Sequence, residues 1–297
     1  MSSPSIGAAA PGRAEAVVLE AYRRYHSPRY IHPDPLEVVL RYPDPADREV
    51  VALICASLAL GRVRSILGIC ADVLARLDRR PGPAGAAVAA AAPESGPAAV
   101  LEQSSLAELR ARFDGFVYRF FGPEEISHFL YAVAEARRRH GSLEDAFLRH
   151  LSAADATVIP ALGGLSQELS EYAGGIHGLL LAQVKRGSAA KRWHLFLRWL
   201  VRADEVDPGG WTRVPSSRLV VPMDTHMHRI CATLGILSRK SADGKAALEI
   251  TEFFRRLDPA DPARFDFSLT RLGIHPDAGR ERAQLLGADG YAFSTQT

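Results

Sequence analysis

The sequence predicts an all-α protein, and three observations point to that fold class. Apolar residues recur at helical spacing in one segment after another along the 297 residues. Asp, Ser, Pro and Gly stand at the ends of these segments, where helices begin and stop. No stretch alternates apolar and polar residues as a half-buried strand does, and we find no internal repeat.

The first part of the chain contains three segments with the apolar spacing of helices: 14–25, 48–60 and 63–77. Residues 30–47 are dense in Pro and Asp. Asp34-Pro35 and Asp44-Pro45 each supply a helix start there, because Asp caps a helix and Pro suits its first turn. Segment 48–60 is almost entirely apolar, so we expect a buried helix that Gly61 ends.

The middle of the chain continues this pattern, with helices predicted at 105–113, 122–139, 142–151 and 161–183. Ser142 is followed by Glu144 and Asp145, which gives the third of these an N-cap and an acidic first turn. The fourth has the weakest pattern because it contains two glycine pairs. Residues 80–96 hold Pro-Gly-Pro and an alanine run, and we expect a loop there with at most a turn or two of helix.

Four more helices are predicted at 193–202, 225–234, 246–257 and 264–272, whereas residues 1–13 and 275–297 read as loose tails. Two sets of aromatic residues are expected to pack in the core rather than to stack on bases: Trp193, Phe196 and Trp199, and Tyr118, Phe120 and Phe121.

The composition excludes several classes of protein. A hydrophobic content of 47%, a charged content of 24% and a net charge of +2 are ordinary for a soluble globular protein and do not by themselves argue for nucleic acid. Cys55, Cys70 and Cys231 are isolated in apolar segments, which predicts buried free thiols, a cytoplasmic setting and no iron–sulfur cluster or other cofactor. We find no signal peptide and no 18-residue apolar span, so we expect no membrane.

The first candidate site segment is residues 185–192, which lead into the helix expected at 193–202. If Ser188 caps that helix, Lys191 lies in its first turn, where the positive partial charge of the helix N-terminus disfavours a cation. An amine held there is suited to act as a nucleophile. The backbone N–H groups of Gly187 and Ser188 are suited to bind a phosphate.

No acidic residue occurs between Tyr172 and Ala203, whereas six basic residues fall in that window: Lys185, Arg186, Lys191, Arg192, Arg198 and Arg202. A basic surface beside helix N-termini suits a nucleic-acid backbone. The alternative is an ordinary solvated basic face of a helix.

The second candidate segment is residues 220–226, where Pro222 disfavours helix upstream and Asp224 is a good N-cap for the helix that follows. We predict that Asp224 faces Lys191 across a cleft; the alternative is a carboxylate that only caps a helix. Asp224, His226 and His228 also have the spacing of a metal-ligand set. On a helix, however, His226 points away from the other two, so we expect no metal site.

Four phrases closely resemble those of a bacterial family catalogued as uncharacterised: residues 33–36, 118–121, 187–192 and 224–229. More distantly, the chain is similar to the helix-hairpin-helix DNA glycosylase superfamily. Its Met223-Asp224-Thr225-His226 matches, almost letter for letter, the phrase that carries the essential aspartate there. Lys191 and Asp224 lie 33 positions apart, which is most similar to the archaeal 8-oxoguanine glycosylase branch.

The resemblance implies two interlocked helical subdomains with a cleft between them. One consists of residues 14–48 plus 203–274, and the other of residues 49–202 with a hairpin at 184–192. The implied function is that of a monomeric DNA-repair glycosylase and AP lyase, which removes a damaged base such as an oxidised purine from duplex DNA.

The resemblance also implies a role for each site residue. Lys191 forms a Schiff base with the sugar, and Asp224 assists it. The residues expected to bind DNA phosphates are Lys185, Arg186, Gly187, Ser188 and Arg192, with His226, His228 and Arg229 in support.

The sequence departs from the superfamily in two places. The hairpin lacks the spaced glycines apart from Gly187, and Leu58, Ala59 and Leu60 replace the polar wedge expected after the buried helix. Two other functions therefore stay open. One is a non-catalytic nucleic-acid-binding protein on the same helical fold, and the other is a metal-dependent hydrolase that uses Asp224, His226 and His228.

Overall fold

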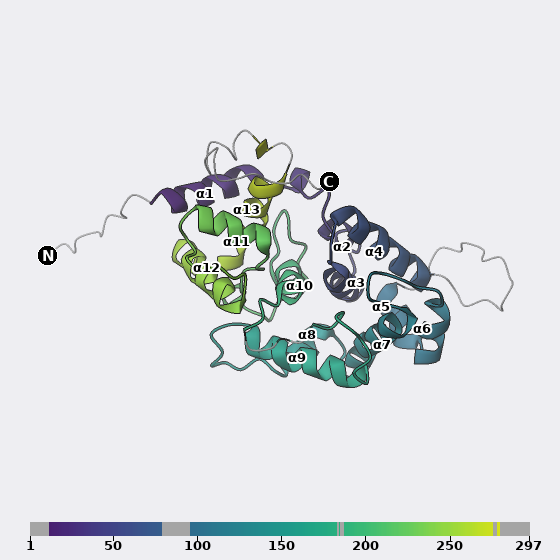
Figure 1. Ribbon diagram of the computed structural model, residues 1–297. Coiled ribbons are helices and arrows are strands. Elements are labelled where there is room, and N and C mark those ends of the chain that lie inside the picture. The colour runs from purple at the N-terminus through teal and green to yellow at the C-terminus, as the bar shows by residue number, and fades with distance from the viewer. Residues whose placement is uncertain (1–11, 79–95, 183, 185–186, 276–277, 280–297) are drawn as a thin grey trace.

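The computed structural model describes residues 12–78, 96–182, 184, 187–275 and 278–279. In these ranges the regular structure is helical, with no strand and with two isolated β-bridges, Tyr118–Phe121 and Ala203–Pro208. The predicted all-α class is therefore confirmed (Figure 1). Residues 80–95 of the loop predicted at 80–96 and most of both predicted tails lie outside the described residues. None of the described helices is long and apolar enough to cross a membrane.

The α-helices occur in the order α1 (Arg13–Tyr25), α2 (Leu36–Val39), α3 (Pro45–Leu58), α4 (Val63–Asp78), α5 (Pro97–Gln103), α6 (Leu106–Arg112), α7 (Pro123–His140), α8 (Leu143–Leu148), α9 (Ile159–Tyr172), α10 (Lys191–Val201), α11 (Thr225–Thr233), α12 (Gly244–Leu257) and α13 (Phe265–Ile274). Three short 3₁₀ turns accompany them, at Pro28–Tyr30, Ser216–Arg218 and Pro262–Arg264.

Two helices differ most from the predictions. α5 was not predicted, because its few apolar residues follow a Pro- and Ala-rich stretch and give no clear period. α9 was predicted to run to residue 183, but it ends at Tyr172. The reason is local: Gly174 and Gly175 adopt φ values of +60° and +75°, the left-handed conformation that stops a helix.

α3 is the core helix, as its apolar sequence predicted. Asp44 caps it by accepting hydrogen bonds from the Ala46 and Asp47 backbone N–H groups, and every residue from Glu49 to Leu58 is buried. α10 packs against α3, while α1 and α11 both pack against α13. Figure 1 shows α10 between the group formed by α1, α11, α12 and α13 and the group formed by the helices from α2 to α9. The division into the two predicted subdomains stays a prediction.

Most of the residues predicted to lie in the core do so. Trp193, Phe196 and Trp199 on α10 are buried, as are Tyr118 and Phe121. The three cysteines are free and buried, which confirms that prediction. Phe120 was also expected in the core, and this was wrong, because its side chain is 74% exposed.

Candidate functional site

Lys191 and Asp224 meet where two helices begin. Lys191 is the first residue of α10, and Asp224 is the N-cap of α11. Lys191 Nζ lies 2.9 Å from Asp224 Oδ2, with the two side chains 36% and 22% exposed. The pair therefore forms a direct ion pair, rather than two groups that face each other across an open cleft.

Asp224 performs two tasks with its two oxygens. Oδ1 accepts hydrogen bonds from the backbone N–H groups of His226 (2.9 Å) and Met227 (2.8 Å), which caps α11. Burial alone raises the pKa of the Asp224 carboxyl. The positive charge of Lys191 and the hydrogen bonds outweigh burial, so that the pKa lies below its usual value of 3.8. The carboxylate is thus ionised at neutral pH and oriented toward the amine.

The start of α10 differs in detail from the prediction. Ser188 does not cap the helix: its Oγ accepts a hydrogen bond from the Ala190 backbone N–H at 3.2 Å, which closes a turn before the helix. Ala190 is the N-cap residue, and its φ of +43° lies in the left-handed region. Lys191 is consequently the first helical residue and not the third. It still lies in the first turn, next to unpaired backbone N–H groups.

The turn before α10 rests on the N-terminus of α12. The Gly244 backbone N–H donates to the Gly187 carbonyl at 3.0 Å. A Cβ on Gly244 would lie 2.6 Å from the Ser188 carbonyl oxygen, so this close approach requires glycine. α10 follows the turn, but the described residues between α9 and the turn are not helical. Residues 185 and 186 of the hairpin predicted at 184–192 lie outside the described residues, and the hairpin stays a prediction.

The residues predicted to bind phosphates fall into three groups. Lys185 and Arg186 lie outside the described residues. Gly187 and Ser188 are exposed beside the ion pair, and their role stays a prediction. Arg192 donates to two backbone carbonyls, those of Ser57 (2.6 Å) and Leu179, and burial lowers its pKa to about 10. The contacts of Arg192 in this structure are thus with the protein itself.

Arg198 and Arg202 are buried, so the predicted basic face does not extend along α10. Arg198 forms ion pairs with Asp207 and Asp266, and Arg202 with Asp207, Asp204 and Asp261. These acids lie beyond the acid-free window of the sequence and fold back onto the helix. The two arginines therefore hold α10 in place.

Sequence reasoning missed Asp266, a second carboxyl near the pair. It lies buried on α13, where burial raises its pKa to about 6 against the opposing effect of Arg198. The charges of Asp224 and Lys191 also act on it, in opposite directions. No spacing in the sequence links residue 266 to either of them; only the fold does.

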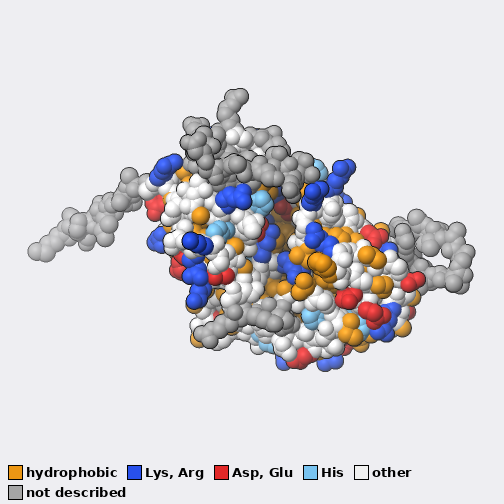
Figure 2. All heavy atoms as spheres, in the orientation of Figure 1, with side chains coloured by type: hydrophobic (Ala, Val, Ile, Leu, Met, Phe, Trp, Pro, Cys, Tyr) orange, Lys and Arg blue, Asp and Glu red, His pale blue; other side chains and the backbone are white. Residues whose placement is uncertain are grey.

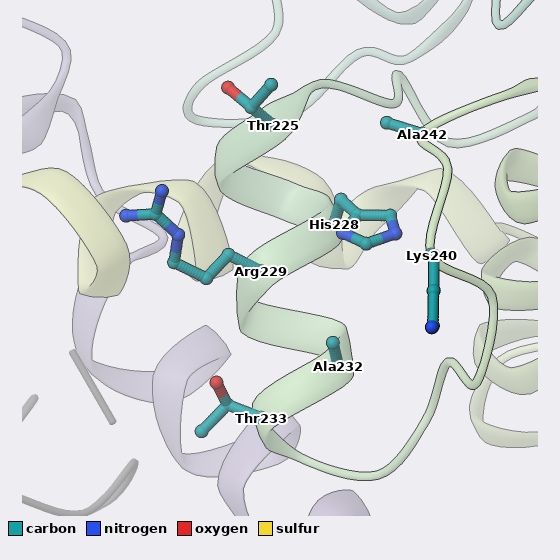
Figure 3. Close-up of a pocket in the computed structure, with 7 residues that line it drawn as sticks. All are labelled: Thr225, His228, Arg229, Ala232, Thr233, Lys240 and Ala242. Atoms are coloured by element: carbon teal, nitrogen blue, oxygen red, sulfur yellow. The ribbon is translucent and has the colours of Figure 1, made fainter. Parts of the chain in front are cut away.

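The outward face of α11 carries a depression of about 400 Å³, lined by Thr225, His228, Arg229, Ala232, Thr233, Lys240 and Ala242. Figure 3 shows these side chains on α11 and on the neighbouring segment of Lys240 and Ala242. The lining includes an arginine, a lysine and a histidine but no acid, and neither Lys191 nor Asp224 belongs to it. Two of the predicted supporting residues thus share a basic hollow next to the ion pair.

The metal-ligand alternative finds no support in the geometry. No group of three or more His, Cys, Asp or Glu side chains in the described part of the chain could hold a metal ion. His226 and His228 are two positions apart on α11, and such positions do not face each other on a helix. His228 Nε2 instead donates to the Arg239 carbonyl at 2.8 Å, while the charge of His226 helps to lower the pKa of Asp224.

Lysine is rare in this chain. Of its 36 Lys and Arg residues, the lysines are Lys185, Lys191, Lys240 and Lys245. Arginine stays protonated in proteins, so an amine nucleophile from a side chain has to be a lysine. Lys191 Nζ touches the partly buried Asp224 carboxylate at a helix N-terminus, so a candidate amine nucleophile and a candidate proton acceptor are in direct contact.

Comparison with known proteins identifies a family. The family model described as "Protein of unknown function (DUF2400)" matches residues 34–275, which is most of the chain. No curated protein and no solved structure matched. The chain that holds the Lys191–Asp224 pair therefore belongs to the DUF2400 family.

Proposed function

We propose that this protein is a DNA-repair glycosylase with AP lyase activity, which removes a damaged base through a Schiff base on Lys191. The single observation that carries the proposal is the 2.9 Å contact between Lys191 Nζ and Asp224 Oδ2 at the start of two helices. The two residues are 33 positions apart and were singled out by their resemblance to the helix-hairpin-helix DNA glycosylases. A buried-helix core and two groups of helices around α10 are compatible with the two-subdomain arrangement of that superfamily.

The proposed reaction uses both members of the pair. Asp224 accepts a proton from the Lys191 ammonium, and the neutral amine bonds to the sugar C1′ as the bond from C1′ to the base breaks. The base leaves with the bonding electrons and takes up a proton. The attached nitrogen passes one of its protons to the ring oxygen O4′, and the bond from O4′ to C1′ breaks to give the protonated imine. The freed base or water then removes a C2′ proton, and the 3′ phosphate leaves with the electrons of the C3′–O bond by β-elimination. In the alternative role, Asp224 stays ionised and stabilises the positive charge that develops on the sugar, while the ammonium loses its proton to water.

The substrate nucleotide has to leave the helix stack before it reaches the pair. Extrusion costs a few kcal/mol, and least at a damaged or mismatched base, which favours lesions. Lys191 and Asp224 are both partly exposed, so we propose that the sugar displaces their mutual contact. The amides of Gly187 and Ser188, together with Lys185 and Arg186, are assigned to the flanking phosphates.

A second candidate function is favoured by one observation. The basic hollow on α11 is open, whereas the Lys191–Asp224 pair is closed by its own contact. A protein that only grips nucleic-acid phosphates would need the hollow and not the pair. Such a binder predicts salt-sensitive association without a covalent product.

Borohydride trapping distinguishes the two functions. Wild-type protein is incubated with duplexes that carry oxidised purines, other damaged bases or an abasic site, and the imine is reduced to a stable adduct. We expect an adduct on at least one lesion that Lys191→Gln abolishes. Lys245→Gln is the matched control, because Lys245 is an exposed lysine on α12 and should leave trapping unchanged. An adduct that persists in Lys191→Gln, or no adduct on any duplex, contradicts the proposed enzyme.

A further inference from the structure

An exposed aromatic residue stands at the tip of a tight turn before α7. Tyr118 and Phe121 exchange backbone hydrogen bonds of 3.0 and 2.9 Å, which close a turn over Arg119 and Phe120. The side chains of Tyr118 and Phe121 are buried, whereas Phe120 is 74% and Val117 75% exposed. The turn is therefore anchored by inward aromatics and presents one phenyl ring to solvent. Val117 and Phe120 together expose more than one isolated apolar side chain, and contiguous exposed apolar surface marks interaction sites.

This turn is hydrogen-bonded to the end of α3, which the start of α10 also contacts. The Tyr118 hydroxyl donates to the Leu60 carbonyl at 2.7 Å, and Arg192 donates to the Ser57 carbonyl at 2.6 Å. Both contacts lie at the C-terminal end of α3, so the tip of the turn and the N-terminus of α10 share one support. The apolar tip is thus tied to the same end of α3 as Arg192, the residue that follows Lys191.

The loop that contains Gly178 and Leu179 connects the turn to the start of α10. Arg192 also donates to the carbonyl of Leu179, a residue whose side chain is 56% exposed. A Cβ on the adjacent Gly178 would lie 3.3 Å from the Phe121 ring. The contacts run from the turn through this loop to Arg192, the residue after Lys191. The exposed side chains of Val117, Phe120 and Leu179 are referred to below as the apolar rim, and Arg192 links this rim to the start of α10.

The surroundings of the rim are basic. Arg119 is exposed and its guanidinium lies over Gly61, where a Cβ would fall 2.0 Å from Nη2. Arg62 and Arg64 are exposed on the same segment after α3. Figure 2 shows apolar side chains beside Lys and Arg side chains at a hollow in the middle of the viewed face, over the region of α10 and α3. An apolar tip among arginines fits a polyanion with stacked bases better than it fits an apolar protein surface.

We propose that Phe120, backed by Val117, is the wedge that enters the base stack of duplex DNA where the damaged nucleotide has been extruded. This assignment rests on the proposed function and supplies the residue that the Leu58-Ala59-Leu60 stretch does not. An aromatic ring fills the vacated space and stacks on the neighbouring bases, which holds the extruded state open. Because the turn is already anchored by hydrogen bonds, no loop has to become ordered when the ring enters the base stack.

The test measures DNA binding and base stacking together. The probe is a duplex with a stable abasic-site analogue and a 2-aminopurine beside it, whose fluorescence rises when the base is unstacked or displaced. We expect Phe120→Ala to weaken Kd for this duplex by about tenfold, the scale of one lost base–aromatic contact, and to lose the fluorescence change. Phe120→Trp should retain both. Leu19→Ala, another exposed apolar truncation but on α1, is the control.

Each outcome of this experiment supports or overturns the assignment of Phe120. Unchanged binding and fluorescence in a folded Phe120→Ala variant overturn the wedge, and so does a wild-type protein that does not bind the duplex. A wild-type dimer in sedimentation that Phe120→Ala separates into monomers assigns the rim to a second copy instead. If wild-type protein gives no trapped adduct while the Phe120-dependent signal persists, the enzyme proposal fails and the wedge stands.

Discussion

Asp224→Asn should separate the capping task of this residue from its proposed catalytic task. Asn keeps an oxygen that can accept from the His226 and Met227 N–H groups, so the cap survives. What is lost is the ion pair with Lys191, and pairs between partly exposed side chains contribute about 0–1 kcal/mol. Asp224→Ala also removes the cap, which adds about 1 kcal/mol. We therefore expect losses of at most about 1 kcal/mol for Asn and about 1–2 kcal/mol for Ala.

The effect on activity should be far larger. Removal of a group that accepts the proton or stabilises the transition state typically costs about 10²–10⁴-fold in rate. A protein with a typical stability of about 5–15 kcal/mol stays folded after losing 1 kcal/mol, so unfolding cannot account for such a loss. The assay compares urea unfolding with single-turnover borohydride trapping on the same preparations. A wild-type trapping rate in Asp224→Asn would refute the catalytic assignment. Equal destabilisation by Asn and Ala would refute the cap argument.

Two further predictions concern stability. Arg198→Met should lower the free energy of unfolding by about 3–5 kcal/mol, because it leaves two buried aspartates without their shared partner. Urea unfolding measures this loss. The control is Arg23→Met, which should show no comparable loss because the Arg23 side chain is 72% exposed. The lowered pKa of Asp224 means that its contribution to stability is present above its ordinary pKa of 3.8 and is lost as the pH falls through the folded-state value. The stability difference between wild type and Asp224→Asn should thus be constant from pH 7 to about pH 5 and shrink below pH 4; a difference that grows on acidification contradicts the sign of the shift.

Local sequence signals predicted much of the fold. Asp44-Pro45 starts α3 and Asp224 starts α11 because capping depends on residues two or three positions away. The end of α9 is also a local matter, because Gly174 and Gly175 follow Tyr172 closely and their left-handed conformation stops the helix. Ser188 failed as a cap because Ala190, not the serine, takes the last non-helical position before α10.

The basic residues between Tyr172 and Ala203 show which contacts cannot be predicted from the order of residues alone. Arg198 and Arg202 were counted with the exposed cations because no acid occurs between Tyr172 and Ala203, although Asp204 and Asp207 follow directly. Their partners come from segments up to 68 positions away, as with Asp266. Phe120 was assigned to the core by its aromatic neighbours, but a turn with two residues at its tip turns it outward.

The sequence by itself determined that the chain is helical, that residues 48–60 form a buried helix, and that a lysine and an aspartate stand at helix starts. These properties depend on interactions within about four residues and on the count of apolar side chains, both of which the linear order contains. Only the tertiary structure decided that Lys191 touches Asp224, that the arginines of α10 turn inward and that Phe120 stands exposed. Each of these depends on how distant segments pack, because burial and ion pairing are set by neighbours in space.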